Sequence, residues 1–338
     1  MTTPLDRFEH NPVLGTEGAH TAVPIGLGEA IVPLLPEDTV PVGPGPEGGE
    51  STSSGGLGIQ ILRVFVENKL AVVGALVVIA IVLFCFAGPS VYHTNQANQQ
   101  AALLNPENAG PGAGHPLGTD QTGFDILGRL MYGGQTSLIV GFASAGVATV
   151  VGVLYGALAG FFGGWIDALM MRIVDVLLSI PVLFMLIALV TIFRASESLL
   201  IFVIAFVSWL IPARLIRGET LSLRVREYVQ AVRVMGGSRR RIVGRHIIPN
   251  AIGTIVVFAT FQIADSILLL AALGFLGFGV PAPQTDWGTM LSNGADAAGN
   301  GWWWQIYPAG IAIVLVVVAF NFVGDALRDA LEVRLQRR

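Results

Sequence analysis

Six runs of apolar residues, most of them long enough to cross a lipid bilayer, constrain this chain more than any other feature of its sequence. The first run, LAVVGALVVIAIVLFCFAG at residues 70–88, is uncharged, and as a helix rising about 1.5 Å per residue it reaches roughly the 30 Å thickness of the hydrocarbon layer. The sequence therefore predicts an all-α membrane protein with six transmembrane helices. The other five predicted spans are residues 138–161, 176–193, 199–211, 251–273 and 306–323.

The composition agrees with a chain embedded in a bilayer. Of its 338 residues, 53% are hydrophobic and only 12% are charged, and a soluble domain could not cover that much apolar surface. The single cysteine, Cys85, lies inside the first apolar run, so no disulfide framework is expected.

The basic residues orient the predicted spans, because Lys and Arg resist translocation across the membrane. With the N-terminus inside the cell, seventeen of the nineteen basic residues fall in cytoplasmic segments, and only Arg129 and Arg194 fall outside. Nine arginines lie within residues 214–245, whereas residues 281–305 contain neither Lys nor Arg. The sequence therefore predicts that both termini are cytoplasmic.

The region before the first span is predicted to lack a packed core. Residues 36–58 contain four Pro and seven Gly, so residues 1–57 are predicted to be a disordered, Pro/Gly/Glu-rich cytoplasmic tail. Residues 58–69 have one polar helical face, which predicts either an amphipathic helix in the membrane interface or an extension of the first span. The six-span domain then covers residues 70–338, with a cytoplasmic loop at 213–249 and extracytoplasmic loops at 89–134 and 275–305.

Residues 227–251, EYVQAVRVMGGSRRRIVGRHIIPNA, form an arginine-rich stretch in the predicted cytoplasmic loop. Helical spacing runs from residue 224 to 235, and Gly236 and Gly237 predict its end, since glycine adopts the left-handed backbone conformation without Cβ strain. An amphipathic cytoplasmic helix without a bilayer partner indicates docking into a protein groove. Its apolar and polar stripes are Tyr228, Ala231, Val232 and Met235, and Arg226, Gln230 and Arg233.

The same segment resembles the loop that marks the permeases of binding-protein-dependent ABC importers. The pattern of that loop is E-A-A, three residues, Gly, nine residues, I-x-L-P. It occurs here as Gln230-Ala231-Val232, then Gly236, then His246-Ile247-Ile248-Pro249. The spacing is kept, while Gln230, Val232 and His246 replace the Glu, the second Ala and the Ile of the pattern.

Further stretches resemble the second membrane subunit of dipeptide, oligopeptide and nickel permeases, over roughly residues 60–335. The resemblance implies the MetI-like permease fold of type I ABC importers, in a bacterial cell membrane, with no enzymatic activity on this chain. The stretches are HPLGTDQTGFDILGRL (115–130), GFFGGWIDALMMRIVDVLLSIP (160–181), ARLIRGETLSLRVREYV (213–229), GFLGFGVPAP (274–283) and NFVGDALRDALE (321–332).

The resemblance also implies the partners of this chain. It would pair with a homologous second permease, two cytoplasmic ATPases that bind ATP and Mg, and an extracytoplasmic solute-binding protein. It would carry no cofactor and bind no nucleic acid, and its helix at about 226–237 would be the coupling helix, seated in a cleft of one ATPase. The residues expected to couple this chain to the ATPase are Arg226, Glu227, Tyr228, Gln230, Ala231, Val232, Arg233, Met235, Gly236, Gly237 and Pro249.

The sequence does not support ATP binding or metal binding by this chain. The only lysine, Lys69, stands in ENKLA, so the G-x-x-x-x-G-K-[ST] loop that cradles ATP phosphates is absent. Five histidines are scattered without metal-ligand spacing, so no metal site is expected. Asp120 and Asp125 do not have the spacing of a calcium-binding EF-hand and instead predict an ordered start of the second span.

Asp265, in FQIADSILLL, places a carboxylate inside a predicted span. Such a group costs about 2.5–3.5 kcal/mol on insertion scales and usually faces a cavity or a partner. Asp265 is therefore predicted either to line a substrate pathway or to bond a neighbouring helix. The main hypothesis is a permease subunit for di- or oligopeptides. The alternatives are a permease for nickel, glutathione or another small solute, and a proton-coupled secondary transporter that uses Asp265.

Overall fold

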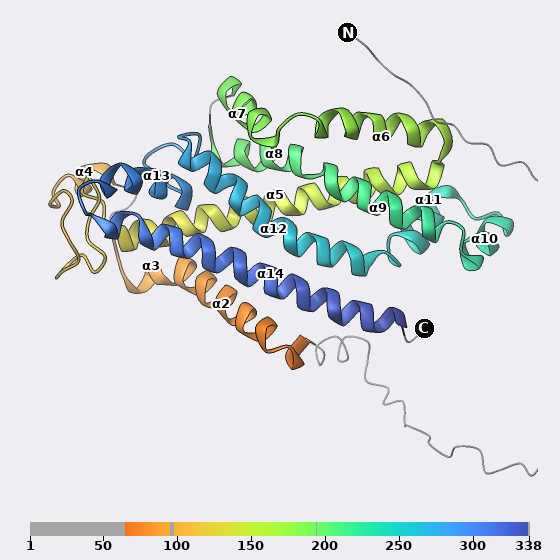
Figure 1. The fold of residues 1–338 in the computed structure, drawn as a ribbon, viewed down its shortest axis with the longest axis horizontal. Helices are drawn as coiled ribbons and strands as arrows, with labels where there is room; N and C mark the ends of the chain where they lie inside the picture. The colour runs from red at the N-terminus through yellow and green to blue at the C-terminus, as the bar shows by residue number, and fades with distance from the viewer. Residues whose placement is uncertain (1–64, 95–97, 194, 337–338) are drawn as a thin grey trace, which may run out of the picture. The chain divides into compact units, whose positions relative to one another are not determined.

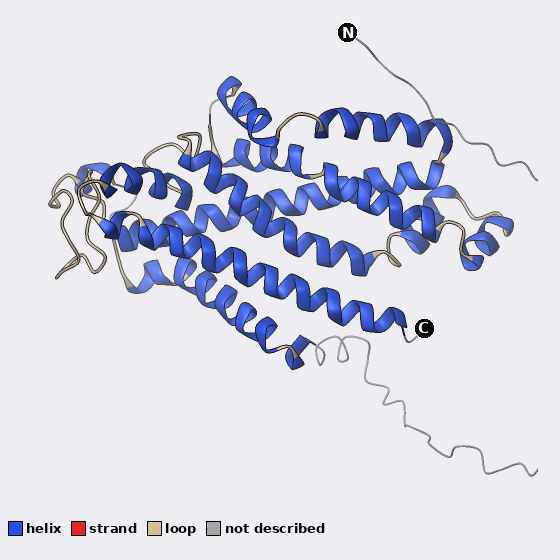
Figure 2. Cartoon of the chain, viewed as in Figure 1, coloured by secondary structure: helices blue, strands red, loops and turns tan. Residues whose placement is uncertain are grey.

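The computed structural model describes residues 65–94, 98–193 and 195–336, and every regular element in these ranges is helical (Figures 1 and 2). The predicted tail at 1–57 and most of the predicted interfacial helix at 58–69 lie outside the described residues. The elements are α2 (Lys69–Phe86), α3 (Gly88–Val91), α4 (Gln99–Ala102), α5 (Ile126–Phe162), α6 (Gly164–Leu178), α7 (Val182–Ile192), α8 (Glu197–Ser208), α9 (Leu210–Leu223), α10 (Glu227–Val234), α11 (Arg239–Ile242), the π-helix η1 (Val243–Ile247), α12 (Ile252–Phe275), α13 (Trp287–Ala298), the 3-10 helix η2 (Trp303–Gln305) and α14 (Tyr307–Gln336).

Four of these helices, α2, α5, α12 and α14, are long and apolar enough to cross a membrane. Two bent pairs, α6 with α7 and α8 with α9, bring the number to six if each pair is one span. The prediction of an all-α chain with several membrane spans is therefore confirmed for the part of the chain that the structure describes. In the view of Figure 1, α10 and α11 lie at one end of the helices, and α4 and α13 lie at the other.

The predicted third span, 176–193, is not one straight helix. Helix α6 ends at Leu178, α7 begins at Val182, and the two axes differ by 84°. Pro181 explains the break, because proline has no N–H to donate and its ring clashes with the preceding turn. The fourth span also bends, by 41° between α8 and α9, and α9 continues to Leu223, so the first third of the predicted loop at 213–249 is helical.

The second span begins earlier than its apolar run, at Ile126 rather than at residue 138. The carboxylate of Asp125 accepts a hydrogen bond from the Gly128 N–H at 2.7 Å and caps the helix. The guanidinium of Arg129, one turn in, is buried and donates to the carbonyl oxygen of Pro283 at 3.0 Å. These polar residues make the first turns of the helix less apolar, so the apolar run alone underestimates the length of the helix.

Helix α13, which the apolar runs of the sequence do not indicate, lies inside the predicted extracytoplasmic loop at 275–305. Asp286 is fully buried at its start and accepts hydrogen bonds from the Thr289 N–H at 2.9 Å and from the Val280 N–H at 3.1 Å. An acidic residue three positions before a threonine, next to a short amphipathic segment, was the available signal for this helix.

Helix α5 is the centre of the packing and contacts α2, α6, α8, α9, α12 and α13. Its contact with α9 is unusually close, because three glycines spaced by four residues, Gly152, Gly156 and Gly160, line one face. A Cβ added to Gly156 would lie 2.3 Å from the carbonyl oxygen of Ala213. Small residues at such spacing let the backbones of two membrane helices approach each other.

Gly156→Ala is expected to destabilise the fold, because the added methyl group has no space against α9 and overpacking costs about 1–3 kcal/mol. Gly146→Ala, in the same helix, is the matched control: no atom lies within 4 Å of its Cβ position, and the loss of a helical glycine should leave stability unchanged or raise it. Thermal unfolding of the purified chain in detergent measures both, and equal midpoints for the two variants would contradict the close α5–α9 contact.

Candidate functional site

The predicted coupling helix exists as α10 and is shorter than its periodicity suggested. It covers Glu227–Val234 rather than 224–235, and Arg226 before it has an extended backbone. The chain leaves the helix through Gly236, whose φ is +81°, so the predicted left-handed glycine at the helix end is confirmed. The Gly237 N–H then donates to the carbonyl oxygen of Val232 at 2.9 Å and closes the turn.

Helix α10 has an inner and an outer face. Val229 is fully buried and belongs to an apolar cluster with Phe161 at the end of α5, Ile216 in the middle of α9 and Ile247 at the end of η1. Val232, predicted to share a stripe with Tyr228, instead packs half-buried against this inner cluster. The outer face is exposed and has an apolar component: Tyr228 (42% exposed), Ala231, Val234 (87%) and Met235 (77%).

The remaining predicted coupling residues lie around this helix. Arg226 and Glu227 are exposed at its start. The Gln230 side chain is partly buried and donates to the carbonyl oxygen of Arg224 at 3.1 Å. Pro249 is exposed two residues after η1, where the Ile248 N–H reaches back five residues to the carbonyl oxygen of Val243 at 3.0 Å.

Several arginines of the loop have specific partners that the sequence did not reveal. The guanidinium of Arg217 donates two hydrogen bonds to the buried carboxylate of Asp167, at 2.6 and 2.7 Å. Arg214 of α9 pairs with Asp175, which lies on α6 as Asp167 does. The two acids lie eight residues apart and thus share a face of α6, which was the one signal that a basic helix packs there.

Two further arginines stack on aromatic rings at the end of α5. The guanidinium of Arg233, on α10, lies 5.7 Å from the ring centre of Phe161. The guanidinium of Arg239, on α11, lies 5.3 Å from that of Phe162. Both distances are within the range of cation–π attraction.

Asp265 lies on α12 in the wall of a cleft of about 610 Å³. No hydrogen bond or ion pair joins Asp265 to another residue within the described ranges, and its side chain is exposed to the cleft. Gln262, one turn earlier on α12, and Ser208, at the end of α8, add polar groups to a wall that is otherwise apolar. The lining comes from α6, α7, α8, α9 and α12 and includes both helix breaks, with Leu178, Pro181, Met185, Leu210 and Leu268.

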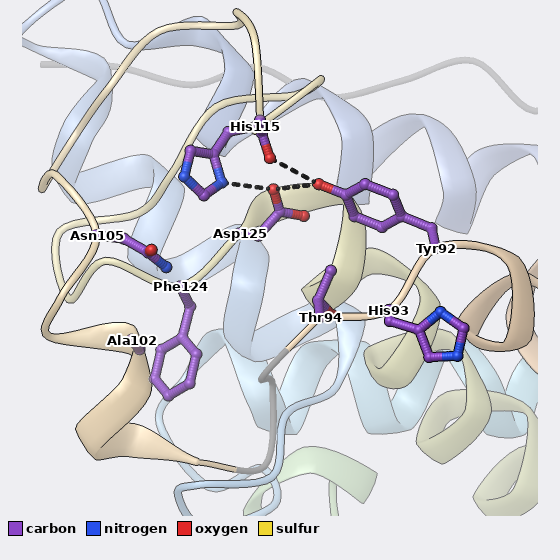
Figure 3. A pocket seen from close by; sticks show the side chains of 9 residues that line it. Tyr92, His93, Thr94, Ala102, Asn105, His115, Phe124 and Asp125 are labelled. Carbon is purple, nitrogen blue, oxygen red and sulfur yellow. Dashed lines mark hydrogen bonds and ion pairs between the residues drawn. The ribbon is translucent and has the colours of Figure 1, made fainter.

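A second polar cluster lies beyond the start of α5, at the opposite end from α10. Figure 3 shows His115 and Tyr92 on two sides of the Asp125 carboxylate, whose Oδ2 lies 2.9 Å from His115 Nδ1 and 3.0 Å from the Tyr92 hydroxyl. Burial and the Asp125 charge raise the pKa of Tyr92 to about 12, so the phenol stays a hydrogen-bond donor. The cluster borders a cavity of about 150 Å³.

Asp120, nearby, accepts hydrogen bonds from the N–H groups of Thr122 at 2.8 Å and Phe124 at 3.0 Å. Together with the capping role of Asp125, these bonds confirm the prediction of an ordered start to the second span. Within the described residues, no three His, Cys, Asp or Glu side chains are grouped so that they could hold a metal ion.

Comparison with known proteins assigns this chain to a family. The family model of binding-protein-dependent transport system inner membrane components matches residues 152–337, and a model of the N-terminal TM domain of oligopeptide transport permease C matches residues 56–111. The first match alone covers more than half of the chain and includes α10 and α12.

Individual relatives agree with the family models. The oligopeptide transport system permease protein OppC of Escherichia coli (strain K12) is 42% identical, over 80% of this chain and 89% of its own length. OppC of Haemophilus influenzae is 39% identical over 80% and 86%. The dipeptide transport system permease protein DppC of Alkalihalophilus pseudofirmus is 39% identical over 80% and 88%. This chain belongs to the family of inner membrane components of binding-protein-dependent transport systems.

Proposed function

We propose that this chain is a membrane subunit of an ATP-driven importer of di- or oligopeptides and forms half of its translocation pathway. The names of the similar relatives, which are oligopeptide and dipeptide permeases, support the substrate class. The observation that carries the coupling role is the exposed face of α10, which is held in place by the buried Val229 on the opposite side. Such a face offers an apolar patch to a protein groove outside the bilayer.

Each partner in this proposal has a separate role. A homologous second permease completes the pathway, and an extracytoplasmic solute-binding protein delivers the peptide. Two cytoplasmic ATPases bind ATP and Mg²⁺ and carry out hydrolysis. Residues 226–237 and Pro249 of this chain form the coupling element, so that closure of the ATPases moves α10 and switches access across the membrane.

The proposed orientation has both termini and α10 in the cytoplasm, and α13 on the outside. The distribution of basic residues supports it, because seventeen of nineteen are then cytoplasmic. The position of α10 and α13 at opposite ends of the helices is consistent with it (Figure 1). The tail at 1–57 is then a cytoplasmic extension.

Asp265 is proposed to line the peptide pathway. Its carboxylate is exposed in the large cleft without a partner among the described residues, which favours pathway lining over a hydrogen bond to a neighbouring helix within this subunit. A carboxylate there would attract solutes that carry a positive charge, as the amino terminus of a peptide does.

The orientation predicts the labelling of two introduced cysteines, Ala298→Cys at the end of α13 and Ser238→Cys after α10, both at exposed positions. A membrane-impermeant thiol reagent added to intact cells should label only residue 298, and residue 238 should react only after the membrane is opened. The native Cys85 is buried and gives little background. The reverse labelling pattern would overturn the orientation.

The coupling proposal predicts that Ala231→Arg and Gly236→Val release the ATPases and abolish peptide uptake, while the chain still inserts in normal amounts. Arginine blocks the exposed face of α10. Valine at φ +81° costs about 1–2 kcal/mol and misdirects the helix end. Pull-down of the ATPases, uptake and membrane abundance are measured on the same cells.

The matched control is Gly244→Val, in the same loop, where no positive φ is required and space is open. It should retain the ATPases. If the loop acts only through its charge, Ala231→Arg and Gly236→Val are tolerated, and only removal of Arg239, Arg240 and Arg241 disturbs the protein.

Asp265→Asn is expected to lower peptide uptake several-fold without loss of the ATPases, because it removes the charge in the cleft and keeps the side-chain shape. The exposed acid Glu107, outside the cleft, supplies the control Glu107→Gln, which should leave uptake unchanged. Uptake by reconstituted importer measures both. Unchanged uptake by Asp265→Asn would mean that the carboxylate has no role in the pathway.

A further inference from the structure

The end of α5 and the turn into α6, residues 160–164, receive a side chain from the coupling loop. We call these residues the elbow. Gly163 and Gly164 both have a positive φ, +66° and +57°, and Gly163 is buried. A Cβ added to Gly163 would lie 2.6 Å from Nη1 of Arg224, so the guanidinium lies directly against a bare backbone.

Arg224 occupies this place from the junction of α9 and α10. Its Nη1 donates to the carbonyl oxygen of Gly160 at 2.8 Å, in the last turn of α5, where helical carbonyls lack partners within the helix. Its own carbonyl oxygen accepts a hydrogen bond from the Gln230 side chain of α10 at 3.1 Å. Arg224 therefore joins α10 to the elbow through its backbone on one side and its guanidinium on the other.

Other contacts support the same connection. The stacked pairs of Arg233 with Phe161 and Arg239 with Phe162 fasten α10 and α11 to the residues inside the elbow. Beyond the elbow, the paired carboxylates of Asp167 and Asp175 tie the length of α6 to α9. The coupling loop, the end of α5, α6 and α9 are thus linked at several points by charged groups.

Helix α6 leads from the elbow to the cleft. Its last residues and the break that follows, including Leu178 and Pro181, line the same cleft as Asp265 of α12. A movement of α6 together with the elbow would therefore change the cleft wall at the 84° bend. By sequence, the loop is connected only to α9 and α12, so the elbow gives it a third route into the membrane helices.

We propose that α6 is a lever of the importer, and that Arg224 is the positioning residue that clamps this lever to the coupling helix. The proposal rests on the docking of α10 to an ATPase. When the ATPases close, α10, the elbow and α6 move together as one body, and the cleft at the far end of α6 opens or closes. The guanidinium transmits the movement and does not contact ATP or solute.

The first test uses the complete importer, with both permeases, the ATPases and the binding protein, in proteoliposomes. Arg224→Gln should keep the ATPases bound and hydrolysing ATP, while peptide uptake per ATP falls about tenfold, the scale of one lost charged hydrogen bond. Arg224→Lys can still donate to the Gly160 carbonyl and should recover part of the uptake. Arg240→Gln, at an exposed arginine of the same loop, should behave like the unaltered chain.

Uptake per ATP at the normal level in Arg224→Gln would overturn the lever. The docking proposal fails separately: if Ala231→Arg keeps its ATPases, α10 is not the docking element at all. If Ala231→Arg loses its ATPases while Arg224→Gln transports normally, docking stands and the lever is wrong.

The second test measures the movement itself and does not depend on how well a variant folds. Spin labels are attached to Ala168→Cys, exposed on α6, and Arg240→Cys, exposed on α11, in the otherwise unaltered importer. Pulsed EPR should give the same distance in the nucleotide-free and ATP-trapped states, because the two helices move together. A distance that changes between these states would overturn the proposal.

Discussion

The close contact of α5 with α9 is the constraint on which the structure around α10 depends. With no side chains at Gly152, Gly156 and Gly160, the backbone of α9 lies directly against α5. That approach brings Arg217 next to Asp167 of α6 and Arg224 next to the carbonyl of Gly160. Larger residues on α5 would push α9 outward, and these polar links would lose their geometry.

The sequence predicted the positions of the four straight spans, because hydropathy and length determine them, although α5 begins before its apolar run and α14 continues beyond it. It could not predict where a helix bends. Two prolines show the difference. Pro181 breaks a helix, whereas Pro212 lies in the first turn of α9, where the missing N–H needs no partner. Pro212 falls in a first turn because the helix bends at Trp209, and packing rather than composition decides where this bend occurs. The short helix α13 was missed for a different reason, because its polar start at Asp286 resembles a loop sequence.

At the candidate site, the sequence indicated which residues form the docking helix, and the structure adds the contacts that hold this helix in place. Gly236 and the helix before it followed from local rules on glycine and periodicity. The buried anchor Val229, and the pairing of Arg217 with a carboxylate fifty residues away, depend on how α5, α6 and α9 pack. The charge of the loop therefore has two uses, because the arginines that favour a cytoplasmic location also fasten the loop to the helix ends.

In the proposed six-span arrangement, the break between α6 and α7 leaves backbone groups without partners inside the membrane. The N–H groups of Val182, Leu183 and Phe184 start α7 with no side-chain cap, and within the described residues the first N–H to find a preceding carbonyl is that of Met185, which donates to Pro181. Lipid cannot satisfy such groups, so an irregular backbone is tolerated there only where protein or a water-filled cavity covers it. The cleft beside Asp265 meets this condition if it holds water. A hydrated cleft at a broken helix, with a carboxylate in its wall, would also keep a charged peptide solvated while it crosses the bilayer.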